Sequence, residues 1–361
     1  MIEALPNLMS MTEPDQSPKP NETAPTVAQG WLHQLIKGVH LRPWHLALGA
    51  VLSALFLWLA FRQVSLSELS DAFTHLDWRF VGLSLFLSVI GTLFRSGRWR
   101  LLYYPQQSQA VFTRLSGLLF FSQMLNLLIP ARLGELARMA FNQPFKPART
   151  LGSIAVEKLL DLLTLLSFLL VLPLAISLPD WFRDSRQSFL ILTLTLFGIS
   201  LVLFLLREKL ITWLGAFLRL IPGKWGGRLQ NALDQALAGL DVFNAPLVGV
   251  GLQAWSFLVW VVGALLNYTL FQAFHLGLPL SAAIFLLLVL QVGITVPAIP
   301  GKLGVFQYLV ILALSTFNVE KDLALSYSLL LYLVAFGPHI LFGTLFGILE
   351  FINLRGRKTL A

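Results

Sequence analysis

The chain has 361 residues, of which 56% are hydrophobic and only 12% are charged. Because a soluble domain of this length would expose too much apolar surface, the composition indicates an integral membrane protein. Cysteine is absent, which excludes disulfides, thiolate metal sites and cysteine nucleophiles. The formal net charge is +8, and its basic residues lie in short segments beside apolar runs. This pattern is typical of membrane topology and not of nucleic-acid binding.

The chain opens with a polar, proline-rich stretch over residues 1–30, which we predict to be a disordered cytoplasmic tail. It lacks the basic and apolar regions of a cleavable signal. Apolar runs then recur, and each suits a helix that crosses the bilayer in about 20 residues. These predicted spans cover residues 46–61, 80–94, 151–175, 187–206, 247–273 and 323–352.

Basic residues set the predicted orientation of the spans, because positively charged loops stay in the cytoplasm. Three segments are basic, and we place each in the cytoplasm: the loop after the second span, with Arg95, Arg98, Arg100 and Arg114, the amphipathic segment 207–246, and the tail 353–361. The alternation of sides then fails unless the regions 115–142 and 281–317 each enter and leave on one side. The run 115–130 is also short, rising about 22 Å against a hydrocarbon core of about 30 Å. We therefore predict two re-entrant helical hairpins.

The predicted fold is an all-α polytopic membrane protein with about six full spans and two re-entrant hairpins, about eight membrane segments in total. The transmembrane domain covers residues 31–352, with half-repeats at 44–178 and 187–352 that start from opposite faces. Such inverted repeats are typical of transporters, whose substrate sites lie near the midplane where broken helices meet. Both termini are expected in the cytoplasm.

A short motif occurs in both hairpins, as "IPARLG" at residues 129–134 and "IPGKLG" at residues 299–304. We predict that it forms the two hairpin elbows, with Arg132 and Lys302 projecting toward one shared cavity. The alternative is generic turn chemistry, because a third copy, "IPGKWG", lies at residues 221–226 in the basic segment. The elbow residues are Pro130, Gly134, Pro300, Gly301 and Gly304.

Charged side chains cluster after the first elbow. Arg132, Glu135 and Arg138 either cap the hairpin at the membrane interface or lie deeper, where a charge partner or an anionic ligand would be needed. Glu157 and Asp161 lie one helical turn apart near the start of the next span. We favour an intramembrane ion pair between these carboxylates and the hairpin arginines; a site for a coupling ion or proton, or catalysis, are the alternatives.

Two sets of uncharged residues have less specific interpretations. Amide side chains within the spans either line a polar cavity or hydrogen-bond between helices: Gln123, Asn126, Gln253, Asn267 and Gln291. Gly343 and Gly347 form a GxxxG pattern, which predicts a face where two helices pack closely. No motif for a metal or a cofactor is found, and we expect neither.

Four stretches carry a family resemblance: "RWRLL" at residues 98–102, "NLLIPARLGELAR" at 126–138, "VEKLLDLL" at 156–163 and "VPAIPGKLGVFQ" at 296–307. They resemble the signatures of the lysylphosphatidylglycerol synthase transmembrane-region family, also called flippase-like domain proteins. The resemblance implies a protein of the bacterial or archaeal cytoplasmic membrane that is associated with moving lipids between leaflets. Lys302 replaces the second glycine of the usual second signature, and Gln307 replaces its glutamate. We do not expect synthase activity, since the chain ends at Ala361 without the soluble transferase domain.

The leading hypothesis is a lipid transporter with a midplane cavity for an anionic or phosphate headgroup. The predicted substrate-binding residues are Arg132, Arg138, Asn126, Lys302 and Gln307. The residues predicted to balance charge or to carry a proton or ion are Glu135, Glu157 and Asp161. Two alternatives remain: a non-transporting subunit that presents lipids to a separate transferase, and an intramembrane lipid-modifying enzyme. Membrane lipids are the expected partners, with no nucleic acid.

Overall fold

The computed structural model describes residues 73–129, 133–142, 144–175, 245–293 and 302–359, together with a few single positions between residues 58 and 209. Every regular element within these ranges is a helix, so the predicted all-α class is confirmed for this part of the chain. The predicted spans at 46–61 and 187–206, the tail 1–30 and most of the segment 207–246 lie outside the described residues.

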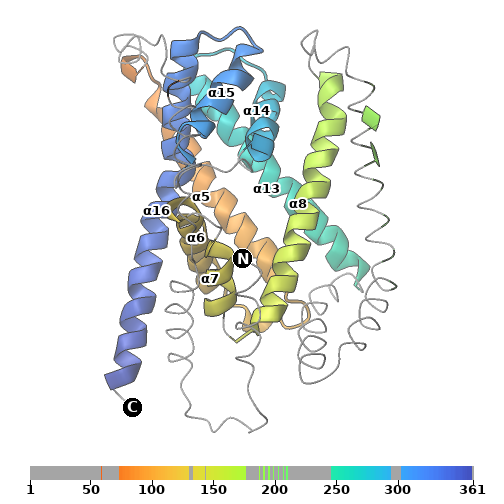
Figure 1. Ribbon diagram of the computed structural model, residues 1–361, viewed down its shortest axis with the longest axis vertical. Helices are drawn as coiled ribbons and strands as arrows, with labels where there is room; N and C mark the ends of the chain where they lie inside the picture. The colour runs from red at the N-terminus through yellow and green to blue at the C-terminus, as the bar shows by residue number, and fades with distance from the viewer. Residues whose placement is uncertain are drawn as a thin grey trace.

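Four long helices form the body of the molecule (Figure 1): α5 (Trp78–Leu101), α8 (Pro147–Ala175), α13 (Pro246–Ala273) and α16 (Lys321–Thr359). They match four of the predicted spans. Within the described residues, three helices are long and apolar enough to cross a membrane, namely Trp78–Leu101, Leu247–Ala273 and Lys321–Ile352. Helix α8 has 29 residues, which is also long enough, but its first half carries four charged side chains.

Two pairs of short helices occupy the regions predicted as hairpins. The first pair is α6 (Phe112–Leu128) and α7 (Leu133–Phe141), and the second is α14 (Leu280–Gly293) and α15 (Val305–Ser315). Within each pair the two helices pack against one another. Figure 1 shows α6 and α7 in the lower half of the molecule and α14 and α15 in the upper half. Residues 130–132 and 294–301 lie outside the described part, and with them Pro130, Arg132, Pro300 and Gly301.

Local chemistry explains where several helices begin. Asp77 caps α5, because its Oδ1 accepts a hydrogen bond from the backbone N–H of Arg79 at 2.9 Å. Helix α13 begins with Pro246, whose missing N–H would have no partner at a first helical position. Before α15 the backbone turns through positive φ angles, 55° at Lys302 and 83° at Gly304. Glycine adopts such a conformation without steric cost, which favours a sharp turn at this place.

Each short helix pair contributes to its own apolar core. In the upper core, α14 and α15 pack against α13 and α16 through buried side chains such as Leu286, Val310 and Tyr327. In the lower core, α6 and α7 pack against α5 and α8 through buried side chains such as Leu118 and Phe141. Between membrane helices such contacts are stabilised by van der Waals packing, because lipid tails are as apolar as the buried side chains.

Helix α16 also packs closely on α6, as the GxxxG pattern predicts. A methyl group added at Gly343 would lie 2.7 Å from the backbone oxygen of Phe120, and one at Gly347 would lie 2.8 Å from the Phe121 ring. At the lower end of the same contact, Arg114 Nη2 lies 2.9 Å from Glu350 Oε1. The GxxxG prediction is confirmed.

The prediction of a basic loop after the second span is wrong for three of its four arginines. Helix α5 does not end near Phe94 but continues to Leu101, so Arg95, Arg98 and Arg100 lie inside a helix. The helix continues beyond the apolar run because carboxylates from another helix neutralise the buried Arg98. Residues 353–359, which we predicted as part of the basic tail, continue α16 as a helix.

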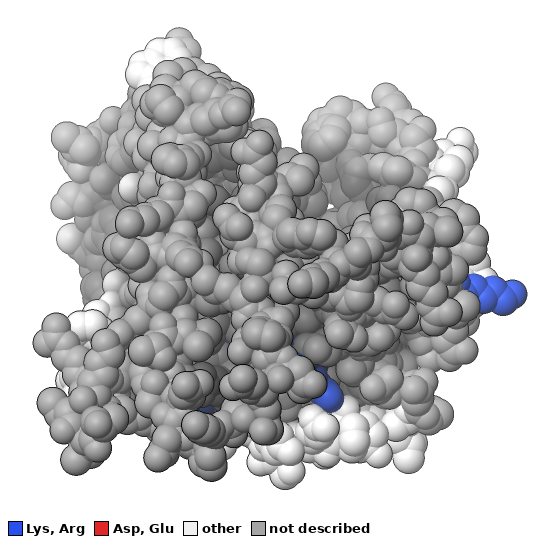
Figure 2. Space-filling view, turned by 60° about the horizontal axis from the view of Figure 1, so that its bottom comes forward, with Lys and Arg blue, Asp and Glu red and all other residues white. Residues whose placement is uncertain are grey.

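The lower end of the molecule carries basic side chains. Figure 2 turns this end toward the viewer and shows Lys and Arg side chains among the described residues there, whereas no described Asp or Glu is visible on this face.

Candidate functional site

A buried cluster of charged residues joins α5, α7 and α8. Arg98 Nη1 of α5 lies 2.6 Å from Asp161 Oδ1, and Arg98 Nη2 lies 3.6 Å from Glu157 Oε1. Arg138 Nη2 of α7 lies 2.6 Å from the other oxygen of the same glutamate, Glu157 Oε2. Glu157 and Asp161 both belong to α8, one turn apart. Glu157 therefore bridges the short helix α7 to the long helix α5.

Neighbouring side chains hold this ion cluster in place. Arg98 Nη1 donates a second hydrogen bond to Ser256 Oγ at 3.0 Å, and Trp260 Nε1 donates to Asp161 Oδ1 at 2.9 Å. Both partners come from α13. The guanidinium of Arg138 stacks on the ring of Trp99, with Cζ 4.0 Å from the ring centroid. The cluster thus connects four helices through charge-assisted hydrogen bonds and one cation–π contact.

The cluster is withdrawn from solvent. Arg98, Arg138 and Glu157 retain only 1%, 3% and 6% of their accessible surface. A charge in a transmembrane helix costs at least about 2.5–3.5 kcal/mol on insertion scales, so such groups face the protein interior and pair with one another. Buried ion pairs contribute little net stability compared with apolar replacements. A cluster of this kind is therefore better explained by a function than by folding alone.

The cluster also carries a net positive charge. Three guanidinium groups, those of Arg95, Arg98 and Arg138, lie near two carboxylates, those of Glu157 and Asp161, and all five interact electrostatically. One positive charge is left without a counter-charge among these residues. This excess suits an anionic ligand.

The carboxylates belong to two different arrangements. Glu157 pairs with Arg138, as expected, whereas Asp161 pairs with Arg98 of α5 and not with an arginine of the first short helix pair. Glu135 takes part in a separate pair with Lys158. Its Oε1 lies 3.6 Å from Lys158 Nζ, and both side chains are partly exposed. The reason is geometric, because Arg138 points to the buried side of α7 while Glu135 lies on a more accessible side.

The two elbow motifs share a hydrogen-bonding arrangement around equivalent glycines. In the first hairpin, Asn126 Oδ1 accepts a hydrogen bond from the N–H of Gly134 at 2.8 Å. In the second, Gln307 Oε1 accepts one from the N–H of Gly304 at 2.8 Å. Gln307 is the third residue of α15 and is buried, so its side chain acts as half of a capping box. In both hairpins an amide side chain satisfies a backbone donor that would otherwise lack a partner.

Other predicted residues have packing roles. A methyl group added at Gly134 would lie 1.9 Å from the backbone oxygen of Ser122, so α7 begins in close contact with α6. Lys302 Nζ lies 6.0 Å from the centroid of the Phe336 ring. Two of the amides hydrogen-bond between helices: Gln253 Nε2 donates to Thr164 Oγ1 at 2.9 Å, and Asn267 Nδ2 donates to the backbone oxygen of Ala283 at 3.3 Å.

Comparison with known proteins identifies the family. The family described as the lysylphosphatidylglycerol synthase TM region matches residues 46–343. The chain belongs to this family. It is also 24% identical over 227 residues to the UPF0104 membrane protein of Methanocaldococcus jannaschii, a match that covers 61% of this chain and 92% of that protein. No solved structure matches.

The lysylphosphatidylglycerol synthase TM region therefore includes every residue of the ion cluster. Sequence reasoning missed Arg95, Arg98 and Trp260 as site residues because the two arginines were assigned to a cytoplasmic loop. A signal was present: Arg95 and Arg98 are three residues apart, as on one face of a helix, and "RWRLL" was already part of the family resemblance. Two carboxylates one turn apart on α8 also require buried cations from another helix.

The family membership also gives a context for Gln307. The resemblance implies glutamate at this position, and the substitution left the role of the second hairpin in doubt. In the structure the side chain accepts from a backbone N–H, and either an amide or a carboxylate oxygen can do so. The capping role is thus compatible with both residues.

Proposed function

We propose that this member of the lysylphosphatidylglycerol synthase TM-region family moves lipids with an anionic or phosphate headgroup between the leaflets of a bacterial or archaeal cytoplasmic membrane. The observation that carries the proposal is the buried ion cluster of Arg98, Arg138, Glu157 and Asp161, which connects a hairpin helix to the spanning helices. Charged groups at such a depth typically mark a pathway for a polar substrate.

The short helix pairs support the same function. A lipid headgroup can cross the hydrocarbon core only along a polar path, and broken helices provide one, because non-helical backbone is tolerated where it lines a cavity. The breaks α6–α7 and α14–α15 approach from opposite ends of the molecule (Figure 1). We propose that both elbows, including Arg132 and Lys302, line one path open to one face at a time.

The guanidinium groups suit a phosphate headgroup. Arginine presents a planar fork that can bind two oxygens of one phosphate by parallel hydrogen bonds. Arg138 and Arg98 each still have a buried Nε atom without a hydrogen-bond partner among the described residues. Glu157 would keep the two guanidiniums apart and orient them, and Glu135 with Lys158 would lie at the more accessible edge of α7.

The test is leaflet exchange of labelled lipids in proteoliposomes, with one anionic and one zwitterionic lipid compared. We expect exchange by the wild type, and loss of exchange in Arg132→Ala and in Glu135→Gln with normal membrane insertion. Arg79→Ala is the matched control, since Arg79 is an exposed arginine at the start of α5. Wild-type rates of exchange in both Arg132→Ala and Glu135→Gln would contradict a role of these residues in headgroup transport. No exchange of any lipid by folded protein would favour a subunit that presents lipids to a separate transferase.

A further inference from the structure

We propose that Arg95 is the residue that binds the phosphate of an anionic lipid headgroup and so sets the preference for anionic over zwitterionic lipids. The inference rests on the proposed function, and it assigns the headgroup contact to a residue outside the recurring motif of the elbows. Arg95 lies on α5, three residues before Arg98, and is half-buried.

Arg95 differs from the other two arginines in its pairing. Arg98 and Arg138 each lie within 2.6 Å of a carboxylate oxygen. No carboxylate oxygen of the described residues lies within salt-bridge distance of Arg95, although Asp161 and Glu157 are near enough to interact with it electrostatically. Both of these carboxylates are already engaged by other arginines. Arg95 therefore carries the positive charge that the cluster leaves uncompensated.

Trp260 separates Arg95 from the nearest carboxylate. The Arg95 Cζ lies 5.8 Å from the centroid of the Trp260 ring, while the indole N–H of the same ring donates to Asp161 Oδ1. The aromatic face attracts the guanidinium without occupying its five N–H donors. Trp260 is only 4% exposed and donates its hydrogen bond to Asp161, so its ring is a fixed aromatic partner for Arg95.

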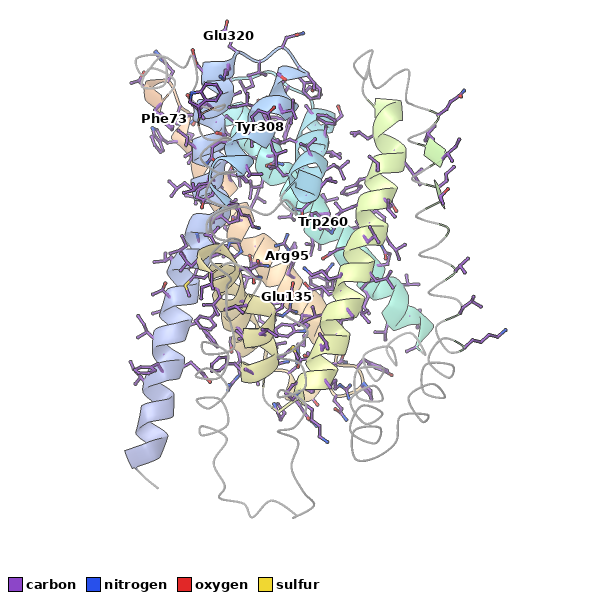
Figure 3. All side chains as sticks on the ribbon, in the orientation of Figure 1. Phe73, Arg95, Glu135, Trp260, Tyr308 and Glu320 are labelled. Atoms are coloured by element: carbon purple, nitrogen blue, oxygen red, sulfur yellow. The ribbon has the colours of Figure 1, made fainter. Side chains whose placement is uncertain are left out.

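The position of Arg95 matches a headgroup on its path across the membrane. Figure 3 shows Arg95 near the middle of the long axis of the molecule, between Trp260 and Glu135. Arg95 is half-buried, whereas Arg98 and Arg138 retain 1% and 3% of their surface. A cation in such a place is costly without a counter-charge, and a phosphate that enters from either leaflet provides one.

The experiment measures both transport and binding in Arg95→Gln, with Arg95→Lys as the charge-conserving variant. Transport is exchange of labelled phosphatidylglycerol and labelled phosphatidylcholine in proteoliposomes. Binding is retention of the same two lipids, and of free glycerol phosphate, by the purified protein in native mass spectrometry. Arg100→Gln is the matched control, because it removes one positive charge from the same helix at an exposed position, where Arg100 Nε donates to the backbone oxygen of Gln107.

In both assays we expect Arg95→Gln to reduce the ratio of phosphatidylglycerol to phosphatidylcholine by about tenfold or more. This factor corresponds to the loss of one charge-assisted hydrogen bond. Exchange of phosphatidylcholine should persist, and Arg95→Lys should keep part of the preference because it keeps the charge. Arg100→Gln should match the wild type. Trp260→Phe, which keeps an aromatic face but loses the hydrogen bond to Asp161, should weaken the preference by a smaller factor.

Three results would overturn the assignment. One is an unchanged preference in Arg95→Gln, and another is an equal loss for both lipids in folded protein, which would indicate a structural role. The third is Arg95-dependent binding of free glycerol phosphate without Arg95-dependent binding of the lipid. If the wild type moves no lipid, the proposed transport fails, and the binding assay still decides whether Arg95 selects anionic headgroups.

Discussion

Glu157 places its two carboxylate oxygens on two different arginines, Oε2 at 2.6 Å from Arg138 Nη2 and Oε1 at 3.6 Å from Arg98 Nη2. One arginine belongs to the short helix α7 and the other to the long helix α5. A single side chain thus couples the position of the first helix pair to that of a spanning helix. Any movement of α7 relative to α5 would change this contact, so the position of α7 and the ion cluster are physically linked.

Glu157→Gln should lower stability strongly. It leaves the buried Arg138 without its carboxylate partner, while Arg98 keeps only Asp161. Removing one partner of a buried pair typically costs about 3–5 kcal/mol. The measurement is the unfolding midpoint of the purified protein in detergent. Glu135→Gln is the control, since the Glu135–Lys158 pair is partly exposed and such pairs contribute about 0–1 kcal/mol.

The double variant Arg138→Met with Glu157→Met extends this prediction. Removal of both partners leaves no unpaired charge at their contact, and Arg98 keeps Asp161. We expect the double variant to be more stable than Glu157→Gln. A double variant that is as unstable as the sum of its single changes would show that the two residues are not coupled.

Gly134→Ala should prevent the close contact at the start of α7. The added methyl group would lie 1.9 Å from the backbone oxygen of Ser122, and backbone cannot move aside as a flexible side chain can. We expect a loss of stability of about 1–3 kcal/mol or failure of α7 to pack on α6. Gly251→Ala in α13 is the matched control, because no atom lies within 4 Å of its added methyl group. It should be neutral or stabilising, since alanine favours a helix by about 1 kcal/mol over glycine.

The capping amides should be interchangeable with carboxylates but not with apolar side chains. Gln307→Leu removes the acceptor for the N–H of Gly304 and should cost about 0.5–2 kcal/mol, as loss of a helix cap does. Gln307→Glu keeps an acceptor at the third helical position and should be milder. Asn126→Leu and Asn126→Asp provide the same comparison for Gly134 in the first pair. Equal unfolding midpoints for the leucine and acidic variants would contradict the capping role.

Much of the helix pattern was predictable, because long apolar runs and a proline at 130 have direct physical consequences. The runs at 80–94, 151–175, 247–273 and 323–352 all lie in helices. The predicted end of the second span was too early for a clear reason. An apolar run ends at its first charged residue, but the helix continues when a carboxylate from another helix neutralises that charge. Arg98 and Asp161 are 63 positions apart, and only the tertiary fold brings them together.

The candidate site was predictable only in part, because some of its contacts depend on the tertiary fold. The spacing of Glu157 and Asp161 indicated an ion pair, and Arg138 was among its expected partners. The choice of Arg98 for Asp161, and of Lys158 for Glu135, depends on which side of each helix faces its neighbour. Helical spacing alone does not decide this, because Glu135 is equally distant in sequence from Arg132 and Arg138. The inverted repeat remains a prediction.

Labelling of single cysteines tests the orientation of the two helix pairs, and the cysteine-free chain makes the measurement clean. Ser108 and Lys146 are exposed and flank the pair α6–α7, while His275 and Glu320 are exposed and flank the pair α14–α15. If each pair enters and leaves on one side, cysteines at the first two positions react with an impermeant reagent from one face only. Cysteines at the other two positions should react from the opposite face only. Reaction of Ser108→Cys and Lys146→Cys from different faces would show that α6 and α7 together cross the membrane, and the two-hairpin topology would then be wrong.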